Sequence, residues 1–446
     1  LAIYKDIGDR AGESRCYTNL GVAYQSLGEY GKAIEYQENA LAIYKDIGDR
    51  AGESRCYTSL GVAYQSLGEY GKAIEYQENA LAISKDIGDR AEESRCYTNL
   101  GVAYQRLGDY GKAIEYQENS LEIAKDIGDR AGESNCYGNL GNAYDSLGDY
   151  GKAIEYYENA LAIKKDIGDR AGESSCYGNL GVAYQRLGDY GKAIEYQENS
   201  LEIAKDIGDR AGESNCYGNL GNAYDSLGDY GKAIEYYENA LAINKAIGDV
   251  DSERVVSYNL GRMYDESEKP ERAYEYYNHS IELSEMMGGR LVEEEHKIGF
   301  YARVSDAYRG MIPLCLKLEE KEDEAFEYAE RSKSRAFLDL IANTEIKPSV
   351  ALTGELKSLR DDEENYLSTL REIQMRHLRQ TGVSVEPGEV AGIFRQLDTI
   401  RDEIEKHDPE YVFTRRGKPL SFDRVQKLLS SPRKDGNAVL IEYFIT

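Results

Sequence analysis

The chain has 446 residues, a formal net charge of -27 at pH 7 and a sequence pI near 4.7. A surface of this charge repels phosphate backbones and anionic headgroups, so nucleic acids and membrane surfaces are excluded as expected partners. The sequence has no apolar run long enough to cross a bilayer and no basic-then-apolar leader at its start. A protein partner is therefore the expectation.

A forty-residue block is repeated six times in succession over residues 9–248. The blocks begin at Asp9, Asp49, Asp89, Asp129, Asp169 and Asp209. A fixed period of this length predicts stacked units, each too small to bury its apolar face alone. Residues 1–8 correspond to the end of a block, and we interpret them as the last part of a truncated repeat. We expect the chain to be a fragment whose uncovered end can promote self-association.

Each block has the pattern of two amphipathic helices joined by a short turn. In the first block the two apolar stripes are Cys16, Leu20, Ala23 and Leu27, then Ala33, Tyr36, Ala40, Ile43 and Ile47. Gly28 and Gly48 stand where helices end in a left-handed turn, and Asp49 is placed to cap the next helix. Gly21 and Ala33 lack bulk, which favours close antiparallel packing.

The same residues carry a family resemblance. Tyr17, Leu20, Gly21, Tyr24, Ala33, Tyr36 and Ala40 follow the order and spacing of the tetratricopeptide repeat (TPR). The usual proline after the second helix is missing, and Lys45 stands near its place. The long format resembles the repeats of kinesin light chains and of Leu-Gly-Asn-type G-protein-signalling adaptors. The resemblance implies an all-α, right-handed superhelical solenoid that acts as a protein-binding scaffold and signalling adaptor.

Two degenerate repeats are predicted over residues 249–342. The first keeps Tyr258, Leu260, Gly261, Tyr264, Ala273 and Tyr276. The second is weaker and carries Ala325 and Tyr328 in its second helix. The resemblance therefore covers roughly residues 1–340.

The first helix of each block has a polar face, which by resemblance lines the concave groove of the solenoid. An asparagine recurs on it, as Asn19, Asn99, Asn139, Asn179, Asn219 and Asn259, with Ser59 the exception. An asparagine has a donor and an acceptor, so such a row can pair with the backbone of an extended peptide. The related adaptors have such an asparagine ladder. The alternative is that each asparagine bonds within its own repeat.

Other positions of the groove differ between blocks. The basic candidates are Arg15, Arg55, Arg95, Arg106 and Arg186, and blocks four and six supply Asn135, Asn142, Asp145, Asn215, Asn222 and Asp225. We expect a partner peptide with acidic side chains near the first blocks. The alternative is that the arginines pair with carboxylates such as Glu13 on the solvated surface.

The cysteine pattern predicts neither a disulfide nor a metal site. Six occupy one position of the repeat, and neighbouring units lie roughly 10 Å apart, which is too far for a disulfide. We interpret them and Cys315 as buried apolar residues in a reducing, cytoplasmic protein. The sequence has no phosphate-binding loop, H-E-x-x-H or C-x-x-C motif, so no catalytic, cofactor or metal site is predicted.

From residue 343 the pattern changes. A helical hairpin is predicted over residues 343–410, with Glu363 breaking the apolar spacing of its first helix. Residues 411–446 then read as a short helix and a strand. The segments 329–341, 419–429 and 439–446 resemble the opening of a CHAT domain, a caspase-like module. That family's catalytic histidine and cysteine come later in the domain, so we expect no enzyme here. The alternative function is the recruiting part of a caspase-like protease.

Overall fold

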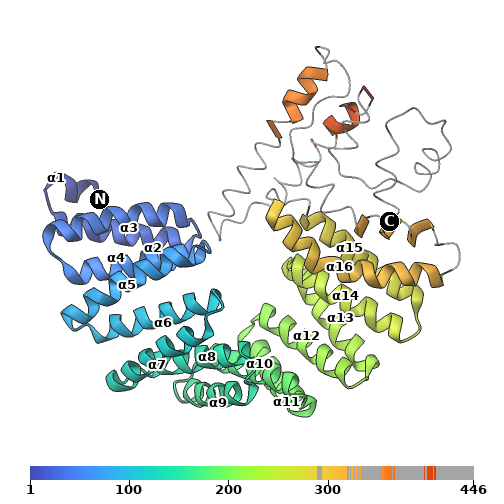
Figure 1. Ribbon diagram of the computed structural model, residues 1–446, viewed down its shortest axis with the longest axis horizontal. Coiled ribbons are helices and arrows are strands. Elements are labelled where there is room, and N and C mark those ends of the chain that lie inside the picture. Colours follow the sequence, from blue (N-terminus) through green and yellow to red (C-terminus); the bar gives the residue numbers. More distant parts are fainter. Residues whose placement is uncertain are drawn as a thin grey trace. The chain divides into compact units, whose positions relative to one another are not determined.

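In the computed structural model the chain is a stack of antiparallel helix pairs (Figure 1). The structure describes residues 1–288 and 294–318 throughout, and shorter stretches within 321–332, 354–366 and 396–407. Every regular element in these residues is a helix, and each forty-residue block forms two. The predicted all-α solenoid of paired helices is confirmed.

The chain divides into two compact units at residues 223 and 224, and helix α12 crosses this boundary. The helices that begin in the first unit are α1 (Ala2–Asp6), α2 (Arg10–Ser26), α3 (Tyr30–Ile47), α4 (Arg50–Ser66), α5 (Tyr70–Ile87), α6 (Arg90–Arg106), α7 (Tyr110–Ile127), α8 (Arg130–Ser146), α9 (Tyr150–Asp166), α10 (Arg170–Leu187), α11 (Tyr190–Ile207) and α12 (Arg210–Ser226). Those of the second are α13 (Tyr230–Ile247), α14 (Val250–Glu266), α15 (Pro270–Gly288) and α16 (Glu294–Lys317).

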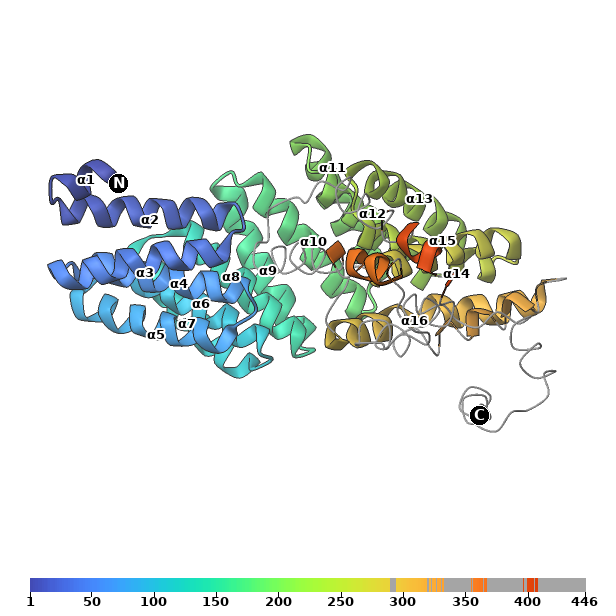
Figure 2. The same ribbon diagram turned by 90° about the horizontal axis from the view of Figure 1, so that it is seen from above.

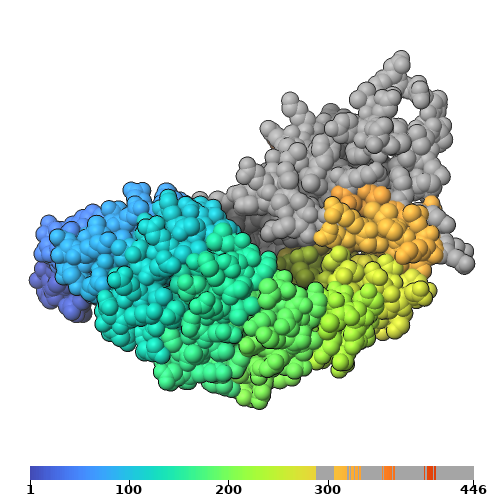
Figure 3. Space-filling view, turned by 60° about the horizontal axis from the view of Figure 1, so that its bottom comes forward, coloured from blue at the N-terminus to red at the C-terminus, as the bar shows by residue number. Residues whose placement is uncertain are grey.

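Within the first unit, each helix pair lies beside the next in chain order (Figure 2). Figure 3 shows the same pairs as neighbouring bands of colour, from blue to green. Each helix pair of such an array contacts only the neighbouring pairs. The array therefore offers a long surface instead of a single pocket.

The helix ends follow the predicted signals. The Asp49 carboxylate accepts a hydrogen bond from the Gly52 N–H at 2.8 Å and so caps α4. Gly48 has a φ of 74°, the left-handed conformation that ends α3. The second helices have either Asp or Glu at the N-cap. Asp109 caps α7 by accepting a hydrogen bond from the Lys112 N–H, whereas Glu29 makes no such cap bond to α3. These signals fix a short turn between each helix and the next.

Small residues bring the two helices of a pair together, as predicted. Leu60 and Cys56 of α4 are completely buried in a cluster with Ala40 and Leu41 of the preceding α3, and Ala63 is nearly so. A Cβ atom built on Gly61 would lie 2.5 Å from Nε2 of Gln77 on the second helix. A larger residue there would push the two helices apart.

Tyrosines join the two helices of a pair, and lysines link one pair to the next. The Tyr64 and Tyr76 rings are stacked with their centroids 5.2 Å apart. Lys45, at the place of the missing proline, lies over the Tyr57 ring of the next block at 5.0 Å. Equivalent contacts recur along the array, and each adds a cation–π attraction across the junction between repeats.

The first helix pair is less covered than the later ones. Cys16 is only half-buried, whereas Cys56 and Cys96 are completely buried. Ile3 and Ile7 of the first turns are 73% and 67% exposed. Their equivalents in the next block are better covered, since Ile43 is 4% exposed and Ile47 is 39% exposed.

Part of the predicted hairpin lies in the described residues. Residues 356–363 and 399–404 are helical, and Leu356 packs with Ile404 in a buried cluster. Glu363 interrupts the apolar spacing of the first helix, and the residue is itself helical. Its buried carboxylate accepts a hydrogen bond from Nε of Arg401 at 2.7 Å. The CHAT-like segment 411–446 and most of 333–353 lie outside the described residues.

Candidate peptide-binding surface

The polar face of the first helices forms one continuous stripe in each block, which we call the first-helix surface. In block one it consists of Arg15, Asn19, Val22, Gln25 and Ser26, with equivalents every forty residues. These positions follow i, i+4, i+7 spacing and therefore share one side of the helix. Successive first helices contact each other, α2 with α4, α4 with α6, and α6 with α8. The stripes therefore lie side by side along the first unit.

The predicted asparagine row lies on this surface with its amides available. Asn99, Asn139, Asn219 and Asn259 are half-buried, and Asn19 and Asn179 are exposed. None of the six makes a side-chain hydrogen bond to any residue that the structure describes. In the described chain, therefore, these amides do not bond within their own repeats. Each retains a donor and an acceptor for another molecule.

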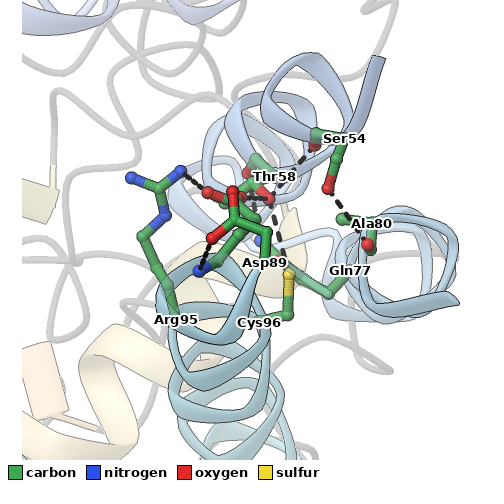
Figure 4. Close-up of polar contacts among 8 residues, drawn as sticks. Ser54, Thr58, Gln77, Ala80, Asp89, Arg95 and Cys96 are labelled. Carbon is green, nitrogen blue, oxygen red and sulfur yellow. Dashed lines mark hydrogen bonds and ion pairs between the residues drawn. The ribbon is translucent and has the colours of Figure 1, made fainter. Parts of the chain in front are cut away.

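Arg95 is held by an acidic residue that only block three contains. Its guanidinium donates to the carboxylate of Glu92, which is buried, where the other repeats in this register have Gly or Ser. The same carboxylate accepts from Oγ1 of Thr58 at 2.5 Å. Figure 4 shows Arg95 and Thr58 on successive first helices, close to each other. The Cys96 sulfur lies 3.6 Å from the Thr58 hydroxyl. Arg95 is thus engaged by a carboxylate of its own helix, although its side chain is 54% exposed.

The carboxylates such as Glu13 pair elsewhere. Glu13 accepts from Arg10 at 2.8 Å, and Glu53 accepts from Arg50 at 2.6 Å. Arg15 is exposed and donates through Nε to its own helix, at the carbonyl of Ala11. Among residues 1–288, neither Arg15 nor Arg55 forms an ion pair. Both cations therefore lie on the first-helix surface without an acidic partner in the described chain.

Later blocks neutralise their own charges across successive first helices. Asp145 of α8 accepts from Arg186 of α10 at 2.5 Å. Asp225 pairs with Arg262, and the Asp265 carboxylate accepts from Lys317 at 3.2 Å. Burial raises the pKa of Asp145, and the Arg186 charge opposes that rise. Arg186 is therefore already paired with an acidic residue of the chain, while its side chain is 47% exposed.

A further set of residues behind the surface was missed by the sequence analysis. Where the first helix carries Val62, the second helix carries Gln77, whose Nε2 donates to the Thr58 carbonyl at 3.0 Å. Where it carries Asn142, the second helix carries Tyr157, whose hydroxyl donates to Oδ1 of Asn142 at 2.8 Å. The sequence signal for this contact is that two positions fifteen residues apart change together, from Val and Gln in one repeat to Asn and Tyr in another.

Reactive groups are shielded in the described part of the chain. Burial raises the pKa of the Cys56, Cys96 and Cys315 thiols to about 11. All seven cysteines are free thiols, and His279 lies 2.7 Å from a carboxylate oxygen of Glu253. Within the described residues, no group of His, Cys, Asp and Glu side chains is arranged to hold a metal, and no helix is long and apolar enough to span a bilayer.

The forty-residue helix pairs match a known family model. The model of the tetratricopeptide repeat matches residues 1–46, 12–86, 92–166, 173–246 and 226–286, which together make up more than half of the chain. The chain belongs to the tetratricopeptide repeat family. A second tetratricopeptide model matches residues 139–206. Tetratricopeptide arrays are protein-binding scaffolds, and their stacked helices create extended surfaces for partners. No curated protein matches this tetratricopeptide chain.

Solved structures share the fold of this tetratricopeptide protein. A signal transduction ATPase with numerous domains and a tetratricopeptide repeat sensor, from Pyrococcus horikoshii, has a TM-score of 0.57 and 19% identity, covering 74% of this chain and 48% of that one. The apo form of RapI has a TM-score of 0.50 and 19% identity, covering 61% and 97%. Nearly identical TPR-like repeats of a kinesin light chain from Podosopora anserina give 0.39 and 23%, covering 43% and 95%. The first two likenesses concern the fold alone.

Proposed function

We propose that this tetratricopeptide protein is a scaffold that binds an extended peptide of a partner protein along its first-helix surface. The row of half-buried or exposed asparagines with unbonded amides carries the proposal. A backbone in extended conformation presents alternating N–H and C=O groups, which such amides can satisfy one repeat after another. A cytoplasmic location is part of the proposal, since the buried cysteines are thiols that a reducing compartment preserves.

The amides stand on helices that are already fixed before a ligand binds. Leu100 and Leu140, one residue after Asn99 and Asn139, are completely buried in the core. Their packing holds the orientation of both first helices, so little conformational entropy is lost when a peptide docks. A surface of this kind recognises backbone by hydrogen bonds and leaves selectivity to the charged positions beside the asparagines.

The test is a screen of a random peptide display library against the purified chain and against the triple variant N99A/N139A/N179A. We expect enriched peptides to bind the wild-type chain and to lose at least about tenfold in affinity on the variant, because each lost amide hydrogen bond contributes about 0.5–1.5 kcal/mol. Far-ultraviolet circular dichroism and the urea midpoint establish that the variant is folded.

The chain supplies its own control. Asn79, Asn199 and Asn239 are exposed or half-buried asparagines on second helices, and each donates its amide to its own helix. The variant N79A/N199A/N239A has the same change of composition but leaves the first-helix surface intact. Equal loss in both triple variants, or no enrichment of any peptide on the wild-type chain, contradicts the proposal.

The recruiting role for a caspase-like protease remains an alternative prediction from sequence. Its characteristic segments, 419–429 and 439–446, lie outside the described residues. Transcript sequencing beyond Thr446 tests it, since downstream strands carrying a histidine and then a cysteine are expected. In that case the peptide bound by the first-helix surface would come from a substrate or regulator of the protease.

A further inference from the structure

Arg106 and Arg186 are two copies of one residue in two different settings. Residues 99–163 are identical to residues 179–243, so both arginines have the same sequence on their C-terminal side. Both are exposed, and both lie in the last turn of a first helix, α6 and α10. Any difference between them must come from residues outside these identical stretches, and the first helix before each one supplies it.

The setting of Arg186 contains a carboxylate. Its Nη1 atom donates to Oδ2 of Asp145 on the preceding first helix at 2.5 Å, and its guanidinium lies over the Tyr150 ring at 6.0 Å. The Asp145 side chain is only 16% exposed, whereas that of Arg186 is 47% exposed. The fold therefore holds a carboxylate between two first helices, where an arginine of the next repeat reaches it.

The setting of Arg106 lacks that carboxylate. The residue that corresponds to Asp145 is Gln65, forty-one residues before Arg106. Gln65 is half-buried and neutral, and Arg106 forms no ion pair with any residue in the described chain. An arginine at this position has a natural anionic partner in the later repeat and none in the earlier one.

Resting on the proposed function, we propose that Arg106 binds an acidic side chain of the partner peptide, and that Gln65 keeps this site open. The carboxylate of the peptide would accept a hydrogen bond from the Arg106 guanidinium, as the Asp145 carboxylate accepts one from Arg186. Asn99 stands seven residues before Arg106 on the same stripe, so a backbone held by the asparagine row passes beside the guanidinium. Charge-assisted bonds to arginine are about twice as strong as neutral ones, which makes this position selective for Asp and Glu.

The occupant is assigned to a partner because, among the described residues, the carboxylates that flank Gln65 and Arg106 in sequence, Glu69 and Asp109, each lie within salt-bridge distance of a lysine. Asp109, near the end of α6, caps α7 and lies 3.7 Å from Lys112. Glu92 is bonded to Arg95 and Thr58. With a net charge of -27, the protein as a whole repels acidic peptides, so attraction requires a local cation that is not neutralised.

The experiment uses peptides enriched on the wild-type chain and synthetic versions in which each Asp or Glu is replaced by Gln or Asn. We expect the acidic peptides to bind roughly tenfold more tightly than their neutral versions. This difference should disappear in R106Q, which removes the cation, and in Q65D, which supplies the carboxylate from within. D145Q should increase it, because Arg186 is released.

Q185D is the matched control for Q65D. It places the same new carboxylate at the same position of another repeat, but the residue forty-one positions later is Ser226 instead of an arginine. It should leave the preference for acidic peptides unchanged. An equal loss in Q185D and Q65D would show a general effect of charge and overturn the assignment to Arg106.

The possible failures are distinguishable. If peptides bind and depend on Asn99, Asn139 and Asn179, but R106Q and Q65D leave the acidic preference unchanged, this inference is wrong and the proposed function stands. If D145Q gains nothing, the Asp145–Arg186 pair is not a model of the ligand contact, and the inference is also wrong. If the wild-type chain enriches no peptide, the proposed function and this inference fall together.

Discussion

Blocks two and four hold their helix pairs together with different side chains, although they share most of their sequence. In block two, Gln77 reaches the carbonyl of Thr58, and Val62 and Gln65 face outward. In block four, the Tyr157 hydroxyl bonds to Asn142, and Asp145 bonds to the next first helix. In block two the positions of Val62 and Gln65 carry no charge, whereas in block four the equivalent Asn142 and Asp145 belong to a polar network with neighbouring helices. Surface chemistry in this array is thus coupled to the core residue behind it.

The largest expected difference in stability between the two repeat types concerns the glycine at which the two helices of a pair come closest, Gly61 in block two and Gly141 in block four. A Cβ atom on Gly141 would lie 2.5 Å from the Tyr157 ring, whereas one on Gly61 would meet the end of the Gln77 side chain. A ring cannot move aside without moving the helix, but a glutamine amide can rotate. We expect G141A to lower the free energy of unfolding by about 1–3 kcal/mol and G61A by less. Urea unfolding of both variants measures this, and equal losses would contradict the distinction.

An intermediate effect is expected from the tyrosine hydroxyl. Y157F removes the bond to Asn142 and should cost about 1 kcal/mol of unfolding free energy. In an N142V background, which restores the valine of block two, the same change should cost little because the partner is already gone. A double-mutant cycle by urea unfolding gives this coupling energy. A coupling indistinguishable from zero would mean that the contact does not distinguish the two repeat types energetically.

The smallest expected effect concerns protonation. The pKa of Asp145 is raised by burial, so its ionisation opposes folding and its unfavourable contribution is lost as the pH falls through that pKa. R186Q removes the opposing positive charge and should raise this pKa further. R186Q should therefore lower the free energy of unfolding at neutral pH. This destabilisation should disappear at a pH where Asp145 is protonated. Carboxyl carbon NMR titration, with D145N to assign the signal, measures the shift, and an unchanged pKa would disprove the pairing.

Much of the fold could be predicted because its signals are local. The cap at Asp49 and the left-handed turn at Gly48 depend on residues within one turn, and the sequence shows both. The burial of Glu363 could not be predicted, for the opposite reason. Its partner Arg401 lies thirty-eight residues away, and apolar periodicity cannot show that a buried carboxylate continues a helix. The candidate surface was predictable as a row of asparagines, but not the pairing state of its charges.

The sequence by itself determined the period, the helix pairs and the row of polar residues on each first helix, since these follow from local propensity and spacing. Only the tertiary structure decided that Arg95 and Arg186 are engaged while Arg55 and Arg106 have no acidic partner in the described chain. The physical reason is that an ion pair between repeats depends on a distance of a few ångströms across two helices. Identical stretches of sequence then acquire different chemistry from the neighbours that stacking provides.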